Sequence, residues 1–409
     1  MPISSVHIPE PTRQAGLARL EEFTVHMGHD YVHKRSFDYG PEADVDADNW
    51  RDNVSRLSPY LKHRLITEHE VVAAAIEAHG PQTADKFVAE VLWRGYFRGW
   101  LEQRPDVWQA YVEDRRSASA KLKVAGGVRK AIEKAELGET GIDAFDHWAR
   151  ELTSTGYLHN HARMWFASIW IFTLKLPWTL GADFFLRHLL DGDAASNTLS
   201  WRWVAGLHTK GKTYLATTEN IEKFSDGRFK PSGLAIEAVP IDEDRNFKLR
   251  PFKSPPVPPK AAKFALLVHE EDCHPESLNL PDVPSLIIAA AAPEAKSDGE
   301  MSVNVCNFSL SAVEDAATRA ASHFGCDVVF WDQGTRLKKL LHDAGLERLL
   351  SSWLPVGPLN DAIGGEIRDA NVKWIVREYD KAIWPLATKG YFPVKKKAPD
   401  ALRAIGLAL

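Results

Sequence analysis

The chain has 409 residues, which is long for a single hydrophobic core and predicts two domains. Its hydrophobic fraction of 44% and charged fraction of 26% are typical of folded proteins and exclude extensive disorder. The net charge of −5 excludes a general attraction to nucleic acid, so such binding would need a local basic surface.

Three features bear on compartment and assembly. The three cysteines are scattered and indicate neither a disulfide framework nor a metal cluster, so we expect no bound metal. The longest apolar run, 286–292, is too short to cross a bilayer, and the first residues lack an apolar signal core. We therefore expect a cytoplasmic protein, and we expect it to be monomeric and without a membrane partner.

Helical periodicity dominates the first 250 residues. Apolar residues recur at helical spacing over 83–103 and 160–175, and strand-like alternation is scarce. Ten of the fourteen tryptophans lie before residue 250, where they fill a large core or surround a bound π-system. We expect a helical domain over residues 1–250.

The residue pattern changes at a proline-rich stretch, residues 251–262, which predicts an extended linker. Beyond it, short apolar runs predict buried strands over 264–269, 285–289, 303–305 and 327–331, with helices over 312–323 and 335–344. This alternation predicts a parallel, Rossmann-like α/β domain over residues 263–409.

Two short segments carry residues suited to chemistry. Ser55 and Ser58 lie at an expected helix start, where hydroxyls and backbone N–H groups hold a phosphate or simply cap the helix. On the helix that follows, Glu90 and Trp93 share a face, and Arg94 lies one turn after Glu90. Glu90 is therefore either a functional carboxyl or half of a surface pair with Arg94.

A third segment combines residues 156–164 with residues 191–203. Its acids, amides and tryptophans predict a polar pocket with aromatic walls. The two closely spaced acids, Asp191 and Asp193, lack the glycine and the final glutamate of an EF-hand calcium loop. The residues alone name no ligand for this pocket.

Together these segments resemble the FAD-binding domain of the photolyase and cryptochrome family. The resemblance covers about residues 35–235, and its most diagnostic strings are 140–164 and 191–203. It implies an all-helical bowl that holds FAD bent into a U. By position, the resemblance implies that FAD is held by Ser55, Leu57, Ser58, Phe87, Arg94, Arg163, Asp191, Asp193 and Asn197.

The same resemblance assigns roles within that set. Ser55, Leu57, Ser58 and Arg94 match residues on the phosphate side. Arg163 and Asp191 match an ion pair over the flavin, which tunes the ring rather than stabilising the fold. Asp193 matches a contact to the pyrimidine edge, and Asn197 faces N5.

A lesion pocket is implied as well. Glu90, Trp93, Asn160, Met164 and Trp203 match family members that repair cyclobutane pyrimidine dimers, whereas enzymes for (6-4) photoproducts have histidines at the positions of Asn160 and Met164. The implied activity is light-driven repair of dimers in DNA, by electron transfer from photoexcited reduced FAD to a flipped-out lesion. The alternative is a cryptochrome-like blue-light photoreceptor without repair activity. We expect His159 and His161, which flank the pocket, to be hydrogen-bonded polar residues.

The chain also departs from the family pattern. Trp201 and Trp178 match the inner members of the electron-transfer chain, but the outer position, within 121–135, has no tryptophan. Phe87 replaces a common indole, and Arg64 stands at a position usually held by glycine. Basic residues after the pocket strings either form a rim for DNA phosphates or lie on a solvated loop; they are Lys210, Lys212, Lys223 and Arg228.

Domain order is the largest departure. Family members usually carry an α/β antenna domain before the FAD domain, whereas the α/β region here follows it. Residues 379–397 loosely resemble the end of that antenna domain. The order is explained either by a circular permutation, which linkers between domains tolerate, or by an unrelated α/β appendage. The sequence names no antenna chromophore.

Overall fold

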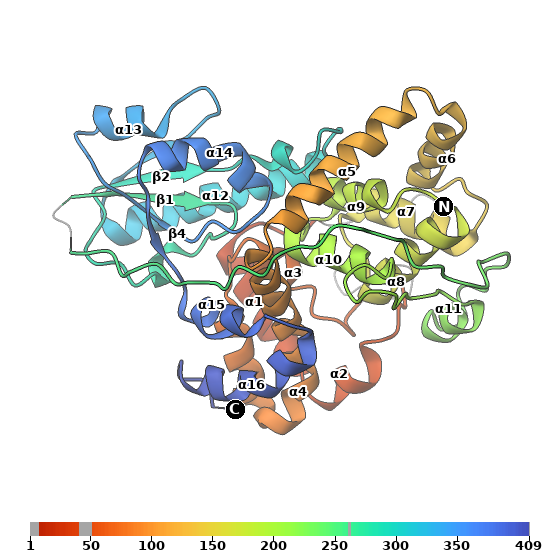
Figure 1. Cartoon of the computed structure of the whole chain (residues 1–409). Helices are drawn as coiled ribbons and strands as arrows, with labels where there is room; N and C mark the ends of the chain where they lie inside the picture. The colour runs from red at the N-terminus through yellow and green to blue at the C-terminus, as the bar shows by residue number, and fades with distance from the viewer. Residues whose placement is uncertain (1–7, 41–50, 261–262, 409) are drawn as a thin grey trace.

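Helices form all the regular structure before residue 225 in the described part of the computed structural model, which covers residues 8–40, 51–260 and 263–408 (Figure 1). They are α1 (Arg13–Thr24), α2 (His29–Lys34), α3 (Ser58–Lys62), α4 (Glu68–Glu102), α5 (Asp106–Leu122), α6 (Gly126–Leu137), α7 (Asp143–Thr155), α8 (Asn160–Ser168), the π-helical turn η1 (Ile169–Thr173), α9 (Trp178–His188), α10 (Ala194–Val204) and α11 (Thr218–Phe224).

The long helix α4 organises this region, and its sequence explains its two halves. Thr67 and Glu70 form a reciprocal capping box at its start. Gly80 interrupts the helix at φ 73°, a left-handed conformation that glycine adopts without steric cost, and Pro81 follows it. The second half of α4, after this kink, therefore takes its own direction and carries Glu90, Trp93 and Arg94.

Residues 225–260 contain neither helix nor strand, as an extended connector requires. The last two residues of the predicted linker, 261–262, lie outside the described residues. A five-stranded parallel sheet follows, in the order β3-β2-β1-β4-β5. Its strands are β1 (Ala265–His269), β2 (Leu286–Ala290), β3 (Asp327–Phe330), β4 (Leu349–Ser352) and β5 (Lys373–Ile375).

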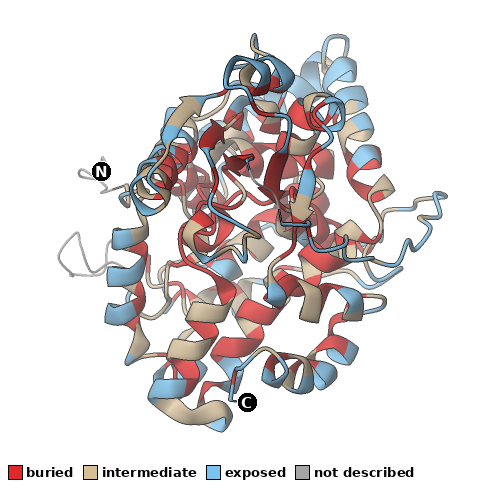
Figure 2. Ribbon diagram, turned by 90° about the vertical axis from the view of Figure 1, so that its left-hand side faces the viewer, coloured by how far each residue is buried: buried red, intermediate tan, exposed pale blue. Residues whose placement is uncertain are grey.

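Helices cover both faces of the sheet. Leu266 and Val268 pack with α12 (Val303–Phe324), while Leu267 faces α13 (Leu337–Asp343) and α14 (Pro358–Asp369). Figure 2 shows the central strands and the inner helix faces as buried, whereas β3 and β5 at the edges of the sheet are partly exposed. Short 3₁₀ turns, η2 (Pro275–Ser277) and η3 (Pro293–Lys296), connect the layers. The predicted parallel α/β architecture is confirmed.

One predicted strand is wrong. Residues 303–305 are the first turn of α12, because the following apolar residues, including Phe308 and Ala312, continue at helical spacing and are buried. Three alternating residues fit a strand and a helix start equally well, and the longer periodicity decides between them.

The last helices return to the helical region. α15 (Glu378–Ile383), η4 (Trp384–Leu386) and α16 (Tyr391–Arg403) pack against α4 (Figure 1). Gly99 permits this contact, because a Cβ there would lie 2.6 Å from the Cα of Trp384. One buried apolar cluster contains residues of α1, α4, the sheet and α16, so the two regions share a core. Across the described stretches, every helix is too short or too polar to span a lipid bilayer.

Candidate functional site

The serine-containing segment forms a helix start, as expected. α3 begins at Ser58, with Pro59 in its first turn and Leu57 buried before it. The hydroxyl of Ser55 accepts a 3.4 Å hydrogen bond from the Leu57 N–H, and the Ser55 carbonyl accepts one from Arg19 at 2.9 Å. The segment therefore presents two hydroxyls at a fixed turn.

Arg94 turns away from Glu90, so the alternative of a surface pair between them is wrong. Its guanidinium contacts Glu68 at 3.3 Å, Asp193 at 3.6 Å and the Lys62 carbonyl at 3.4 Å. Burial and the neighbouring Arg98 lower the pKa of Arg94 from its ordinary value. A buried cation with long contacts is a favourable neighbour for a further anion.

The acids of the third segment are held in position by arginines. Arg163 binds Asp191 through two parallel hydrogen bonds of 3.0 and 2.8 Å. Asp193 caps α10 by accepting from the Ser196 N–H at 2.8 Å, and it accepts from Arg98 at 2.9 Å. Burial raises the pKa of Asp193, but Arg98, Arg94 and the Ser196 N–H together outweigh burial and hold the pKa below its ordinary range.

These groups have the chemistry that a flavin dinucleotide requires. Hydroxyls and a buried guanidinium suit the phosphates, and the ring edge needs both donors and acceptors. Arg163 and Asp191 supply one of each, while Asn197 donates its Nδ2 to the Ala182 carbonyl at 2.8 Å. Phe87 packs edge-on against Tyr31, with ring centroids 5.1 Å apart. The residues present therefore fit FAD.

Glu90 lies beside the start of α8. Its carboxylate accepts a 2.6 Å hydrogen bond from Arg35, and burial raises its pKa. The Arg35 carbonyl in turn contacts His159 Nε2 at 3.0 Å, next to the exposed Asn160. Arg35 thus connects Glu90 to His159, the residue before Asn160. It was missed because a lone arginine after α2 carries no sequence signal.

The flanking histidines behave as predicted. His161 Nδ1 contacts the Ser36 carbonyl at 2.7 Å, and His159 Nδ1 accepts from the His161 N–H at 3.2 Å. Burial lowers the pKa of both rings, to about 3 for His159. They fix the chain beside the pocket as neutral, hydrogen-bonded groups.

The remaining predicted pocket residues are half-buried. Met164 lies one turn after Asn160 on α8, as expected. One face of Trp93 is covered by Tyr391 of α16, with ring centroids 3.6 Å apart and planes 9° from parallel. Trp203 stacks on Tyr214 at 5.5 Å.

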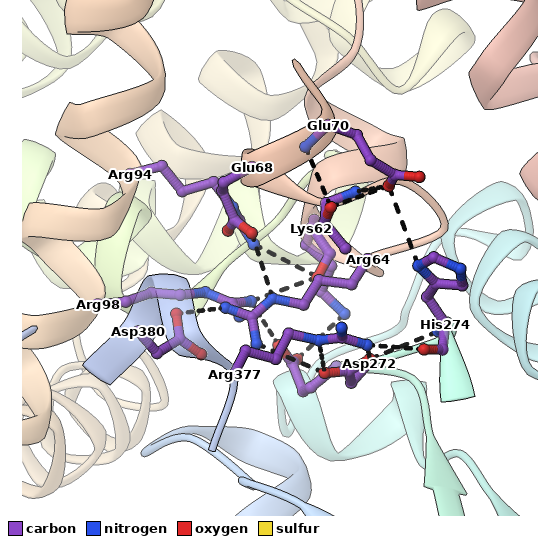
Figure 3. Close-up of polar contacts among 12 residues, drawn as sticks. Lys62, Arg64, Glu68, Glu70, Arg94, Arg98, Asp272, His274, Arg377 and Asp380 are labelled. Atoms are coloured by element: carbon purple, nitrogen blue, oxygen red, sulfur yellow. Dashed lines mark hydrogen bonds and ion pairs between the residues drawn. The ribbon is translucent and has the colours of Figure 1, made fainter. Parts of the chain in front are cut away.

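A buried ionic network joins this site to the α/β region (Figure 3). Glu271, just after β1, binds Arg98 at 2.8 Å and Lys62 at 3.1 Å, so it connects through Arg98 to Asp193. The connected groups balance in charge, with six cations and six carboxylates: Lys62, Arg64, Arg94, Arg98, Lys296 and Arg377 against Glu68, Asp193, Glu270, Glu271, Asp272 and Asp380.

Arg64 explains one departure from the family pattern. Its φ of 50° lies in the left-handed region that favours glycine, the residue common at this position. The strain costs about 1 kcal/mol. Its guanidinium binds Asp380 of α15 at 2.7 Å and Asp272, which follows β1, at 3.5 Å. The strained backbone at Arg64 thus accompanies ion pairs that connect the helical region to the α/β region.

The predicted electron-transfer tryptophans are buried in the helical core. Trp201 contacts Trp170 edge-on at 6.3 Å. Trp178 packs on Tyr111 at 5.7 Å, and Tyr111 packs on Trp108 at 5.3 Å. Tyr111 and Trp108 are thus aromatic neighbours of Trp178, and the electron-transfer role of Trp178 and Trp201 stays a prediction.

The predicted DNA-binding residues divide into two groups. Lys210, Lys212 and Lys223 are exposed. Arg228 is partly buried and donates to the Asp38 carbonyl at 3.0 Å. The lysines are thus available to a ligand at the surface, while Arg228 also contacts the chain's own backbone.

Comparison with known proteins identifies similarity over the same part of the chain. Residues 87–234 match the family model described as the FAD binding domain of DNA photolyase. This part of the chain is similar to the FAD-binding domain of DNA photolyases. A photo-lyase of Streptomyces griseus is 36% identical over 176 residues, covering 42% of this chain and 36% of that protein.

Other photolyases give similar values. A photo-lyase of Thermus thermophilus is 32% identical over 51% of this chain and 46% of its own. The crystal structure of an archaeal photolyase from Sulfolobus tokodaii with two FAD molecules has 26% identity and a TM-score of 0.40, over 53% of this chain and 44% of that one. The chain spans less than half the length of these relatives.

Proposed function

We propose that this chain is a deoxyribodipyrimidine photo-lyase that repairs cyclobutane pyrimidine dimers in DNA. The observation that carries the proposal is the Glu90–Arg35 pair, whose Arg35 carbonyl contacts His159, the residue before Asn160, in the same helical region as the Arg163–Asp191 pair. A light sensor has no need of an acid and an amide arranged to hold a base. Bound FAD would supply the light-driven transfer of an electron to the dimer and its return.

The chain's own residues would then bind, orient and shield. Ser55, Ser58 and Arg94 hold the phosphates, and the Arg163–Asp191 pair fixes the orientation of the ring. A dimer must leave the helix to reach this site, and a damaged pair is easier to unstack. Glu90, held by Arg35 in a partly buried place, hydrogen-bonds the flipped bases and stabilises charge on them. Met164 and Trp203 form apolar walls.

We also propose that the α/β region corresponds to the family's antenna domain in permuted order, with the domain boundary in residues 251–262. The five-stranded parallel sheet and its position against the flavin-side network support this. The alternative function is a photoreceptor without repair. Tyr391 closes one face of Trp93, so a substrate base would contact Trp93 only from its other side.

Repair of a dimer-bearing oligonucleotide under blue light separates these functions. The reduced wild-type protein is expected to restore the DNA in light and not in the dark. Glu90→Gln keeps the shape but removes a charged hydrogen bond worth about 1.5–3 kcal/mol, so the repair rate should fall about tenfold or more with normal FAD content. Glu113→Gln, on an exposed part of α5, is the matched control. Dimers that persist in light, despite bound and reducible FAD, would favour the photoreceptor.

A further inference from the structure

Helix α16 places an aromatic ring on the candidate lesion pocket. Tyr391 stacks on Trp93 at 3.6 Å, and its hydroxyl donates to the Ala89 carbonyl at 2.8 Å. Burial and the nearby Glu90 both raise the pKa of Tyr391. The ring is therefore held by its stack on Trp93 and by its hydroxyl bond to Ala89, the residue before Glu90.

The two sides of α16 differ in chemistry. Val394, Ala398 and Leu402 are buried against the shared core. Away from this buried side, Phe392 is 79% exposed, Lys396 is exposed one turn further on, and Lys397 is exposed on a different face of the helix. Phe392 and Lys396, one turn apart, therefore present an aromatic ring and an ammonium group side by side to solvent.

The local charge is opposite to that of the whole chain. Residues 389–403 contain five Lys and Arg residues and one Asp, whereas the complete chain has a net charge of −5. Lys395 is neutralised by Asp85 at 2.9 Å, but Lys396 and Lys397 project to the exposed side. Positive charge is thus concentrated on α16, the helix that carries Tyr391, where it complements a polyanion.

We propose that α16 forms the outer wall of the substrate site. Tyr391 holds the ring of Trp93 in place, while Phe392, Lys396 and Lys397 contact the DNA strand next to the dimer. This inference rests on the proposed function. It extends the proposed substrate site by a surface of α16, the last helix of the described chain. A nucleic acid strand is the occupant that fits, because lysines neutralise its phosphates and an exposed ring stacks on its unpaired bases.

A lysine-pair experiment tests the surface. The double substitution Lys396→Ala with Lys397→Ala is compared with Lys338→Ala with Lys339→Ala, two adjacent exposed lysines on α13, which Figure 1 shows far from α16. Binding of a labelled dimer-bearing strand is measured by fluorescence anisotropy over a range of salt concentrations. Loss of two phosphate contacts should weaken binding about tenfold or more at 0.1 M salt and reduce the salt slope by about 1–2.

The outcomes separate the two levels of the proposal. If the α16 variant binds like the α13 control while the wild-type protein binds dimer-bearing DNA, the α16 surface is refuted and the proposed function stands. If the wild-type protein binds no DNA, the proposed function fails and this surface fails with it.

A second experiment tests Tyr391 as a positioning residue. Tyr391→Leu removes the stack on Trp93, whereas Tyr391→Phe keeps it and removes only the bond to Ala89. The measured quantity is the ratio of affinities for dimer-bearing and undamaged strands, which a purely structural role would leave unchanged. We expect Tyr391→Leu to lower this ratio several-fold and Tyr391→Phe to preserve it, with FAD content normal in both. An unchanged ratio in Tyr391→Leu refutes this role. If Tyr391→Leu does not fold, Tyr391→Phe provides the test. A fall in its affinity ratio that accompanies a fall in FAD content refutes the positioning role of Tyr391.

Discussion

Removing the charge of Glu271 tests whether the ionic network joins the two regions. Glu271→Gln keeps the size of the side chain but leaves Arg98 and Lys62 with one carboxylate fewer, so the balanced network gains a net positive charge. Breaking one partner of a buried pair costs about 3–5 kcal/mol. Because the Glu271 side chain is 12% exposed, we expect the lower end, about 3 kcal/mol.

Calorimetry can measure this change directly. For a chain of 409 residues that unfolds as one unit, an unfolding entropy of about 2.1 cal/mol/K per residue converts 3 kcal/mol into a Tm decrease of about 3–4 °C. The control is Glu378→Gln, whose carboxylate pairs with Lys381 at the surface and should matter by less than about 0.5 kcal/mol. Equal Tm values for the two variants, or two separate wild-type transitions, would contradict the reasoning.

Three further predictions concern pH, packing and electron supply. Burial raises the pKa of Glu102 from 4.5 to about 7, so the folded chain keeps a proton that the unfolded chain loses. The contribution of Glu102 to the free energy of unfolding is present below pH 4.5 and is lost as the pH rises to about 7. In urea unfolding, the wild-type protein should therefore lose about 3 kcal/mol relative to Glu102→Gln over that pH range. A difference between the two proteins that stays constant with pH would refute this. Gly181→Ala should destabilise the fold by about 1–3 kcal/mol, because the added Cβ would lie 2.3 Å from Trp201. Gly127→Ala, which has open space around it, should be neutral or stabilising. Equal thermal shifts for the two variants would show that the core adapts to the added Cβ. Trp201→Phe should slow the light-driven bleaching of oxidised FAD with an external donor, while Trp331→Phe in the α/β region should not, and equal bleaching rates would remove Trp201 from electron supply.

Periodicity was sufficient for the long elements and insufficient for the short ones. The apolar spacing around Glu90 and after Asn160 predicts helices that the structure contains. The strands β4 and β5 escaped prediction because four and three residues, with serines or lysine among them, carry too little pattern. The same shortness made residues 303–305 resemble a strand.

The site shows the same division between local and distant information. The pairing of Arg163 with Asp191 joins residues 28 positions apart within strings that resemble one family, so their proximity could be anticipated. Arg35 and Glu90 are 55 positions apart, and Arg64 and Asp380 are 316 apart. Contacts at such separations depend on how the helical and α/β regions pack, which residue spacing does not encode.

The central claim is that the helical region of this chain holds FAD. The most direct measurement is the chromophore released by heat from the purified protein, identified by chromatography and quantified against the chain. The account predicts FAD at about one molecule per chain, reduced to a small fraction of that in Asp191→Ala, which removes the partner of Arg163. A wild-type protein that carries no flavin, and that takes up none when FAD is added, would contradict the account.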